Sequence, residues 1–138
     1  MKMPHIGHVG IIVKDMDSAV AKLTALLGVP PSRLKEIPDV GLKTAEFETA
    51  NLTLELLQYT DEKASFAKEV MGERPGLNHL SVTVNDVNEA IRNWTEKGLV
   101  LTEGFPRNGA HGKVAFFQTE PDTGILFEVC QPDESGGH

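Results

Sequence analysis

The sequence predicts an α+β fold of two tandem βαβββ modules, which form a curled, barrel-like mixed sheet with the helices outside. The first observation is an internal repeat, in which residues 7–29 align with 78–100 without a gap. His79 follows His8 by 71 residues and Glu128 follows Glu55 by 73, so the two modules are almost equally long. We place module one at 5–58, a linker helix at 59–76, module two at 77–131 and a flexible tail at 132–138.

The other two observations are the periodicities within each module. Residues 8–13 and 79–84 read as strands, the second with clear alternation of apolar and polar residues. A helix follows each strand, with Asp15 or Asp17 as the N-cap of the first and Asn85 or Asp86 as that of the second. Gly28 and Gly98 are expected to end these helices. Three more strands complete each module, at 34–37, 42–49 and 51–58 and at 100–103, 112–118 and 124–131.

Composition excludes several classes of protein. The 138 residues suit one compact domain or two tightly packed half-domains, and the net charge of −7 argues against nucleic acid as a partner. No apolar stretch is long enough to cross a membrane, and the first residues do not resemble a signal peptide. The single cysteine, Cys130, excludes an internal disulfide and fits a reducing compartment, so we expect a cytoplasmic protein.

Each module carries one histidine and one glutamate on the strand face that points away from its helix. His8 and Glu55 belong to module one, and His79 and Glu128 are their equivalents. A lone histidine there would indicate a surface residue, and a lone glutamate an edge strand. A buried unpaired carboxylate costs several kcal/mol, however, and here the repeat matches two such pairs. If the sheets curl toward each other, two imidazoles and two carboxylates suit Zn, Co, Ni, Mn or Fe.

The remaining histidines and the cysteine are weaker candidates. His5 has the opposite strand parity from His8 and is expected on the surface, while His138 lies in the tail. His111, in the loop GAHGK, is expected either at the cavity mouth or in solvent. Cys130 is expected to be a small core residue.

Nearly the whole chain, from GHVGIIVKD to FEVCQ, resembles the vicinal oxygen chelate superfamily (glyoxalase/bleomycin resistance/dioxygenase) and, within it, most closely the methylmalonyl-CoA epimerases. The segments that resemble the epimerases are GLKTAEFETANLTLELL, SFAKEV, GLNHLSVTVNDV and PRNGAHGKVAFF. The resemblance implies that His8, Glu55, His79 and Glu128 are the metal ligands. Asn78 stands where the family usually has a first histidine, and Thr119-Glu120-Pro121 where it tends to have His-Pro-Lys.

The resemblance implies a metal-dependent epimerisation of methylmalonyl-CoA or a close 2-acyl-CoA acid through an enolate, in a homodimer. The divalent ion would be Co, Zn, Ni or Mn. Glu128 is the expected catalytic base. The second base would be Glu46, because Thr44 occupies the position where some members carry a catalytic glutamate. Arg107 and Lys113 are the candidates for attracting the phosphates of the CoA tail, although ordinary solvated surface is an equal alternative for both. His111 is a further candidate for binding the substrate.

Other functions remain open at this point. EPDTGILFEV resembles the ending common in lactoylglutathione lyase-like isomerases, but the first helix lacks their Phe-Tyr pair. A ring-cleaving dioxygenase normally keeps only two histidines and one carboxylate, so Glu55 counts against it. A metal-free small-molecule binding or resistance protein typically loses the ligands, and the aromatic content of 6% also disfavours it.

Overall fold

The computed structural model describes residues 3–60, 66–109 and 111–133. The chain divides into a first unit, His8–Asn78, and a second unit, which runs from His79 onward and includes the residues before His8. The expected α+β fold with two tandem βαβββ modules is confirmed. Parts of three predicted segments lie outside the described residues, namely 61–65 of the linker helix, 110 of the GAHG loop and 134–138 of the tail.

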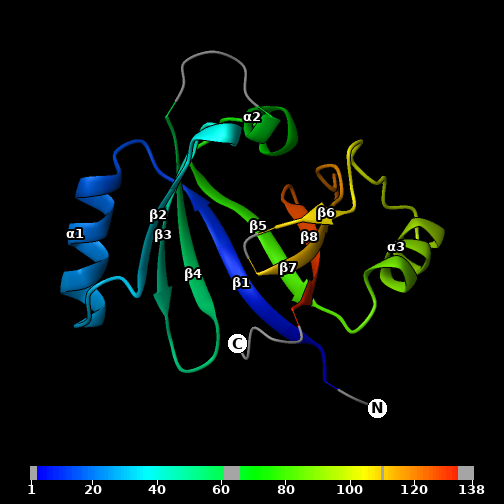
Figure 1. Cartoon of the computed structure of the whole chain (residues 1–138), viewed down its shortest axis with the longest axis horizontal. Coiled ribbons are helices and arrows are strands. Elements are labelled where there is room, and N and C mark those ends of the chain that lie inside the picture. Colours follow the sequence, from blue (N-terminus) through cyan, green and yellow to red (C-terminus); the bar gives the residue numbers. More distant parts are fainter. Residues whose placement is uncertain (1–2, 61–65, 110, 134–138) are drawn as a thin grey trace. The chain divides into compact units, whose positions relative to one another are not determined.

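The first module forms a mixed sheet with the strand order β2-β3-β4-β1. β1 pairs in parallel with β4, and the other two pairings are antiparallel (Figure 1). A short 3-10 helix, Pro38–Val40, separates β2 from β3. The elements are β1 (His5–Ile12), α1 (Met16–Leu27), β2 (Arg33–Ile37), β3 (Leu42–Glu48), β4 (Thr53–Tyr59) and α2 (Phe66–Met71).

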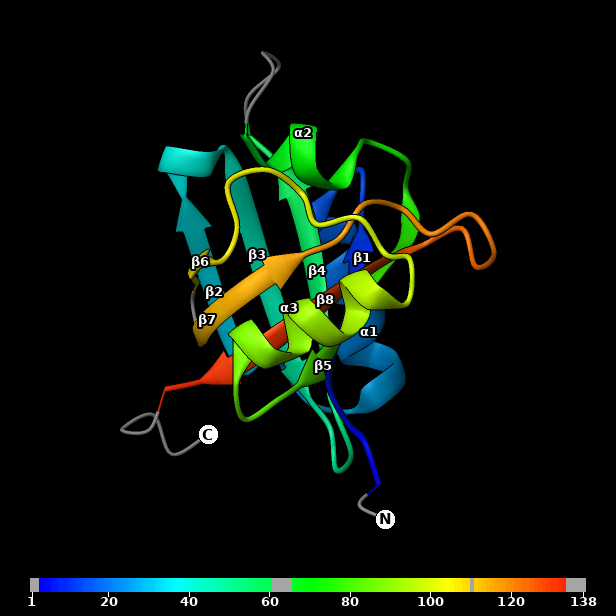
Figure 2. The same ribbon diagram turned by 90° about the vertical axis from the view of Figure 1, so that its right-hand side faces the viewer.

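The second module repeats this arrangement with the strand order β5-β8-β7-β6. β5 pairs in parallel with β8, the two remaining pairings are antiparallel, and α3 lies across β7 and β8 (Figure 2). The elements are β5 (Gly76–Thr83), α3 (Val87–Glu96), β6 (Arg107–Asn108), β7 (Gly112–Phe116) and β8 (Leu126–Pro132). In the part of the chain that the structure describes, no helix is long and apolar enough to span a bilayer.

The register of the parallel strand pairs is the same in both modules. Gly10 lies opposite Glu55 on β4, and Ser81 lies opposite Glu128 on β8. In both cases the histidine of the pair, His8 or His79, stands two residues earlier on the first strand. The repeat seen in the sequence is therefore also a repeat of hydrogen-bonding register.

One face of each sheet packs against its own helix. Met16 of α1 packs with Ala45, Phe47 and Leu56, all of them buried. In the second module the equivalent cluster is Val87, Ala90, Ala115, Phe117 and Val129. Since neighbouring residues of a strand point to opposite faces, Glu55 and Glu128 project from the face away from the helix. This agrees with the parity predicted from the sequence.

The helix caps decide between the two predicted alternatives in each module. Asp15 caps α1 and accepts a hydrogen bond from Asp17 N, and Asp86 caps α3 and accepts from Asn88 N and Glu89 N. Gly28 ends α1 in a left-handed conformation, as expected. Gly98, with φ of 100°, directly follows the C-cap Lys97 and ends α3, also as expected.

Two glutamines join each helix to the strand that carries the glutamate. Gln58 Oε1 accepts a hydrogen bond from Met16 N, the first residue of α1. Gln131 Oε1 accepts one from Val87 N, the first residue of α3, at 3.0 Å. Each glutamine stands three residues after its glutamate and occupies one of the N–H groups that a helix leaves unsatisfied at its start. The three-residue spacing was visible in the sequence, but this role was not predicted.

The predicted strand at 100–103 is wrong. Only an isolated bridge, Leu101 to Phe117, forms there, and the fourth strand of the module is β6 at Arg107–Asn108. Gly104, with φ of 95°, and Pro106 interrupt the extended segment, since proline has no N–H to donate to a ladder. β4 and β8 each begin two residues later than expected, because Asn51–Leu52 and Gly124–Ile125 belong to the preceding turns.

Tyr59, at the end of β4, generates a stability prediction. Its hydroxyl donates to Gly72 O and, at 3.4 Å, to Ala67 O, so it ties the strand to α2 and the loop beyond. Tyr59→Phe should lower the free energy of unfolding by about 1 kcal/mol, measured by urea titration. An unchanged midpoint would show that these hydrogen bonds contribute nothing.

Burial and, to a lesser extent, the charge of Glu73 raise the pKa of Tyr59 from 10.0 to about 12. The stabilisation linked to this hydroxyl is therefore complete below pH 10 and is lost as the pH rises through 12. Tyr59→Phe should remove this part of the pH dependence, which unfolding curves at pH 9 to 12 would detect.

Candidate functional site

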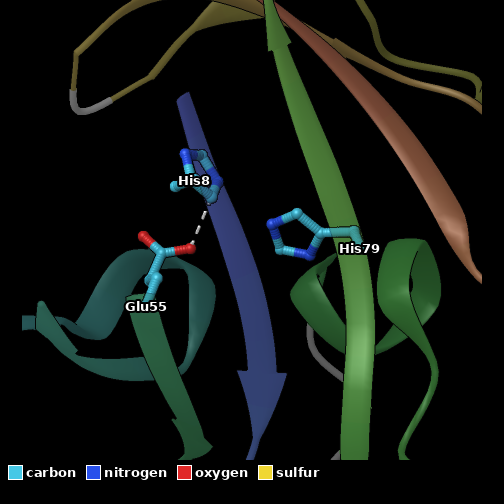
Figure 3. A group of neighbouring side chains, drawn as sticks. All are labelled: His8, Glu55 and His79. Atoms are coloured by element: carbon cyan, nitrogen blue, oxygen red, sulfur yellow. Dashed lines mark ion pairs between the residues drawn. The ribbon is translucent and has the colours of Figure 1, made fainter. Parts of the chain in front are cut away.

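His8 and Glu55 form a pair within the first unit. His8 Nε2 lies 3.6 Å from Glu55 Oε1, and the two side chains are 17% and 16% exposed. Figure 3 marks this ion pair with a dashed line. The distance suits an ion pair but is too long for a good hydrogen bond. The parallel register of β1 and β4 produces this proximity, because it sets His8 diagonally beside Glu55 on one face of the sheet.

His79 and Glu128 occupy the equivalent positions in the second unit. Both are buried, His79 at 1% exposure and Glu128 at 5%. The His79 ring projects from β5 (Figure 3), and its edge contact with the Phe116 ring has a centroid distance of 5.0 Å. Phe116 lies directly opposite Glu128 on the neighbouring strand. The imidazole of His79 is therefore packed against an apolar ring on the strand face that carries Glu128.

Each glutamate is paired with a residue on either side of it, and the pairing continues to a fourth residue. We call such a line of paired residues across four adjacent segments of the sheet a row. The two rows occupy equivalent positions but differ in chemistry, because a carboxylate in the first corresponds to an aromatic ring in the second. In the first module the row is Arg33, Glu46, Glu55 and Gly10, and in the second it is Thr102, Phe116, Glu128 and Ser81.

Glu46, the candidate second base, lies directly opposite Glu55 on the face away from α1. It is 7% exposed, whereas Glu48 at the end of the same strand is exposed. Thr44, two residues earlier, lies opposite Leu57 and is buried. The first module therefore presents a second carboxylate, the buried Glu46, directly beside the half-buried Glu55.

The three candidates for binding the substrate lie in different environments. Arg107 is exposed and lies opposite Val114, so it shares the strand face of Glu128. Lys113 is exposed on the other face, to which α3 packs. His111 is exposed, and its carbonyl accepts a hydrogen bond from Asp133 N. Of the two cations, only Arg107 is on the face that carries the histidine and glutamate.

The two residues that the sequence excluded from the site behave as expected. His5 is exposed at the start of β1. Cys130 is buried, and burial together with the charges of Glu128 and Asp133 raises the pKa of its thiol to about 11. A thiol that stays protonated at neutral pH is a poor nucleophile and a poor metal ligand.

The candidate ligands fit a divalent metal by their chemistry. The first unit offers the imidazole of His8 and the carboxylate of Glu55, and the second offers those of His79 and Glu128, all of them donor types that divalent metals accept. Imidazole and carboxylate ligands together suit zinc and its first-row neighbours. Gln58, Gln131 and Ser81 were not predicted, although the sequence shows each glutamine three residues after a candidate glutamate and Ser81 two residues after His79.

The superfamily model described as glyoxalase/bleomycin resistance protein/dioxygenase matches residues 7–117. The chain belongs to this superfamily. It is 32% identical over 130 residues to the ethylmalonyl-CoA/methylmalonyl-CoA epimerase of Cereibacter sphaeroides, covering 91% of this chain and 96% of that protein. It is 27% identical over 133 residues to the uncharacterized protein YqjC of Bacillus subtilis, covering 94% of each.

The fold also matches solved structures of epimerases. The methylmalonyl-CoA epimerase of Mycobacterium tuberculosis superposes with a TM-score of 0.78 at 25% identity, over 95% of this chain and 89% of that one. The resemblance to methylmalonyl-CoA epimerases read from the sequence is therefore confirmed at the level of family and fold.

Proposed function

We propose that this chain is a metal-dependent epimerase of methylmalonyl-CoA or a close 2-acyl-CoA acid, working as a cytoplasmic homodimer. The observation that carries the proposal is the matched register of the two histidine–glutamate pairs, Gly10 opposite Glu55 and Ser81 opposite Glu128. The relationship to the Cereibacter sphaeroides epimerase supports the substrate class.

His8, Glu55, His79 and Glu128 would hold one divalent cation, namely Co, Zn, Ni or Mn. When bound, the cation supplies Lewis-acid chemistry that makes the proton next to the thioester carbonyl more acidic. The distance of 3.6 Å between His8 Nε2 and Glu55 Oε1 supports this role.

Glu128 would take the α-proton of the substrate. The C–H bond breaks, the proton moves to the carboxylate, and the electron pair becomes part of an enolate. Glu46, as a carboxylic acid, would return a proton to the opposite face of the same carbon. The reverse reaction exchanges the two roles, so the reaction is an isomerisation without any change in oxidation state.

The remaining residues of the proposal bind the substrate. Arg107, on the strand face of Glu128, would attract the phosphates of the CoA tail. Lys113 and His111 are exposed near the same hairpin and would contact the substrate only outside the strand face that carries Glu128. Phe116, beside His79, would exclude water from the reacting carbon and so strengthen the electrostatic interactions there.

The proposed activity is tested by deuterium wash-in. Metal-loaded protein is incubated with methylmalonyl-CoA in heavy water, and deuterium at the α-position is followed by mass spectrometry. We expect metal-dependent exchange above the background rate, abolished by a chelator and lowered at least about 100-fold in Glu128→Ala. Loaded protein that shows no exchange would contradict the substrate, and glutathione hemithioacetals, substrates of the lyase-like alternative, would be assayed next.

The metal site is tested by metal content and calorimetry. His8→Ala and His79→Ala should each weaken binding of one Zn²⁺ or Co²⁺ per chain by at least about tenfold. His5→Ala, at an exposed position outside the repeat, is the matched control and should bind as the wild type does. If the wild-type protein binds no divalent ion, the alternative function as a metal-free small-molecule binding protein would be favoured.

Glu46→Gln separates the two proposed bases. With a single pure epimer as substrate, the variant should invert the α-carbon about 100-fold more slowly, because the second proton carrier is missing. Exchange without inversion should persist for the epimer whose proton faces Glu128. Glu48→Gln, on the same strand but exposed, is the control and should retain both rates. Unchanged inversion in Glu46→Gln would remove Glu46 from the reaction.

A further inference from the structure

The Ser81 side chain on β5 is a buried polar group without an internal role. Ser81 is 1% exposed, and its Oγ has no hydrogen-bond partner among the described residues. Hydroxyl groups buried in proteins are nearly always hydrogen-bonded, because leaving one unsatisfied carries a free-energy penalty. A hydroxyl kept in this state points to a partner that arrives from outside the chain.

The position of Ser81 identifies where that partner would lie. Ser81 stands directly opposite Glu128 in the parallel register of β5 and β8, and both side chains project from the face away from α3. His79 is two residues earlier on the same strand and therefore on the same face. The hydroxyl is consequently beside the carboxylate that the proposed reaction uses as its base.

Comparison of the modules shows that the fold does not require this hydroxyl. Gly10 occupies the equivalent position of the first module, opposite Glu55 in the same register. A strand pair of this geometry thus forms with no side chain at that point. The serine distinguishes the second module from the first, as Phe116 does where the first module has Glu46.

We infer that Ser81 is a further catalytic residue, whose Oγ–H donates a hydrogen bond to the substrate oxygen that becomes negative as the α-proton moves to Glu128. This inference rests on the proposed function. The substrate class is a thioester or carboxylate with an acidic α-proton, since its carbonyl oxygen gains charge when the C–H bond breaks. The hydroxyl keeps its own proton, and the electron pair of the C–H bond moves into the enolate.

A donor placed where charge develops favours the transition state over the bound substrate. The neighbouring Phe116 ring is apolar, and a low local dielectric at this face would strengthen a single hydrogen bond. Removing the donor should therefore lower kcat more than it raises KM.

The test compares Ser81→Ala with Thr102→Val. Thr102 Oγ1 is also buried without a hydrogen-bond partner among the described residues, but it lies at the far end of the row, beyond Phe116. Both substitutions remove a hydroxyl without a hydrogen-bond partner among the described residues, but only that of Ser81 lies beside Glu128. Purified metal-loaded enzymes are assayed for kcat and KM with methylmalonyl-CoA, for Co²⁺ affinity by calorimetry, and for Tm.

We expect kcat of Ser81→Ala to fall about 100-fold with KM within about threefold of the wild type. Its Co²⁺ affinity should be unchanged and its Tm equal or higher, since no internal hydrogen bond is lost. Thr102→Val should keep kcat within about twofold. A Ser81→Ala enzyme as active as the wild type, an equal loss in Thr102→Val, or a loss accompanied by a lower Tm or weaker Co²⁺ binding would overturn the role of Ser81.

The assays distinguish an error in the role of Ser81 from an error in the proposed epimerase activity. Wild-type enzyme that epimerises methylmalonyl-CoA while Ser81→Ala is equally active overturns only the inference about Ser81. Wild-type enzyme that binds Co²⁺ but does not exchange the α-proton overturns the proposed function and the role of Ser81 with it.

Discussion

The parallel pairing of the first and last strand of each module is the constraint on which the rest of the structure depends. It joins β1 to β4 and β5 to β8 in one register, and thereby fixes the glutamate relative to the histidine. The glutamine three residues after each glutamate then binds the first N–H of the helix. One strand pair therefore positions the candidate ligands on one face and the helix on the other. A slip of one residue would move every one of these groups to the wrong face.

Burial on both faces explains the composition of these strands. The face toward the helix carries Phe47 and Leu56 in one module and Phe117 and Val129 in the other, all without exposure or nearly so. The opposite face is also largely buried but carries carboxylates, imidazoles and hydroxyls. A polar group buried in this way lowers the free energy of unfolding unless it has a hydrogen-bonding or ionic partner. A cluster of such groups on one strand face therefore indicates a binding site.

Much of this could be predicted from the sequence, because strand parity and repeat spacing are local properties. The repeat matched His8 with His79, and alternation assigned Glu55 and Glu128 to the face away from the helix. The features that were missed or wrongly predicted depend on contacts between residues far apart in the chain. The glutamine bonds reach across more than 40 residues, and β6 formed after Pro106 instead of before it because a turn displaced the strand. The position of Ser81 opposite Glu128 required the register, which alternation alone does not provide.

The matched registers have a historical consequence. A single module already contains its histidine, its glutamate and the glutamine that binds the start of its helix. An ancestral chain of half the length could therefore have formed the same fold as a dimer of two identical modules. Duplication and fusion of its gene would leave the registers that β1–β4 and β5–β8 share. Once the copies were joined, each could mutate alone. Gly10 against Ser81 and Glu46 against Phe116 are differences that two identical chains could never have acquired separately.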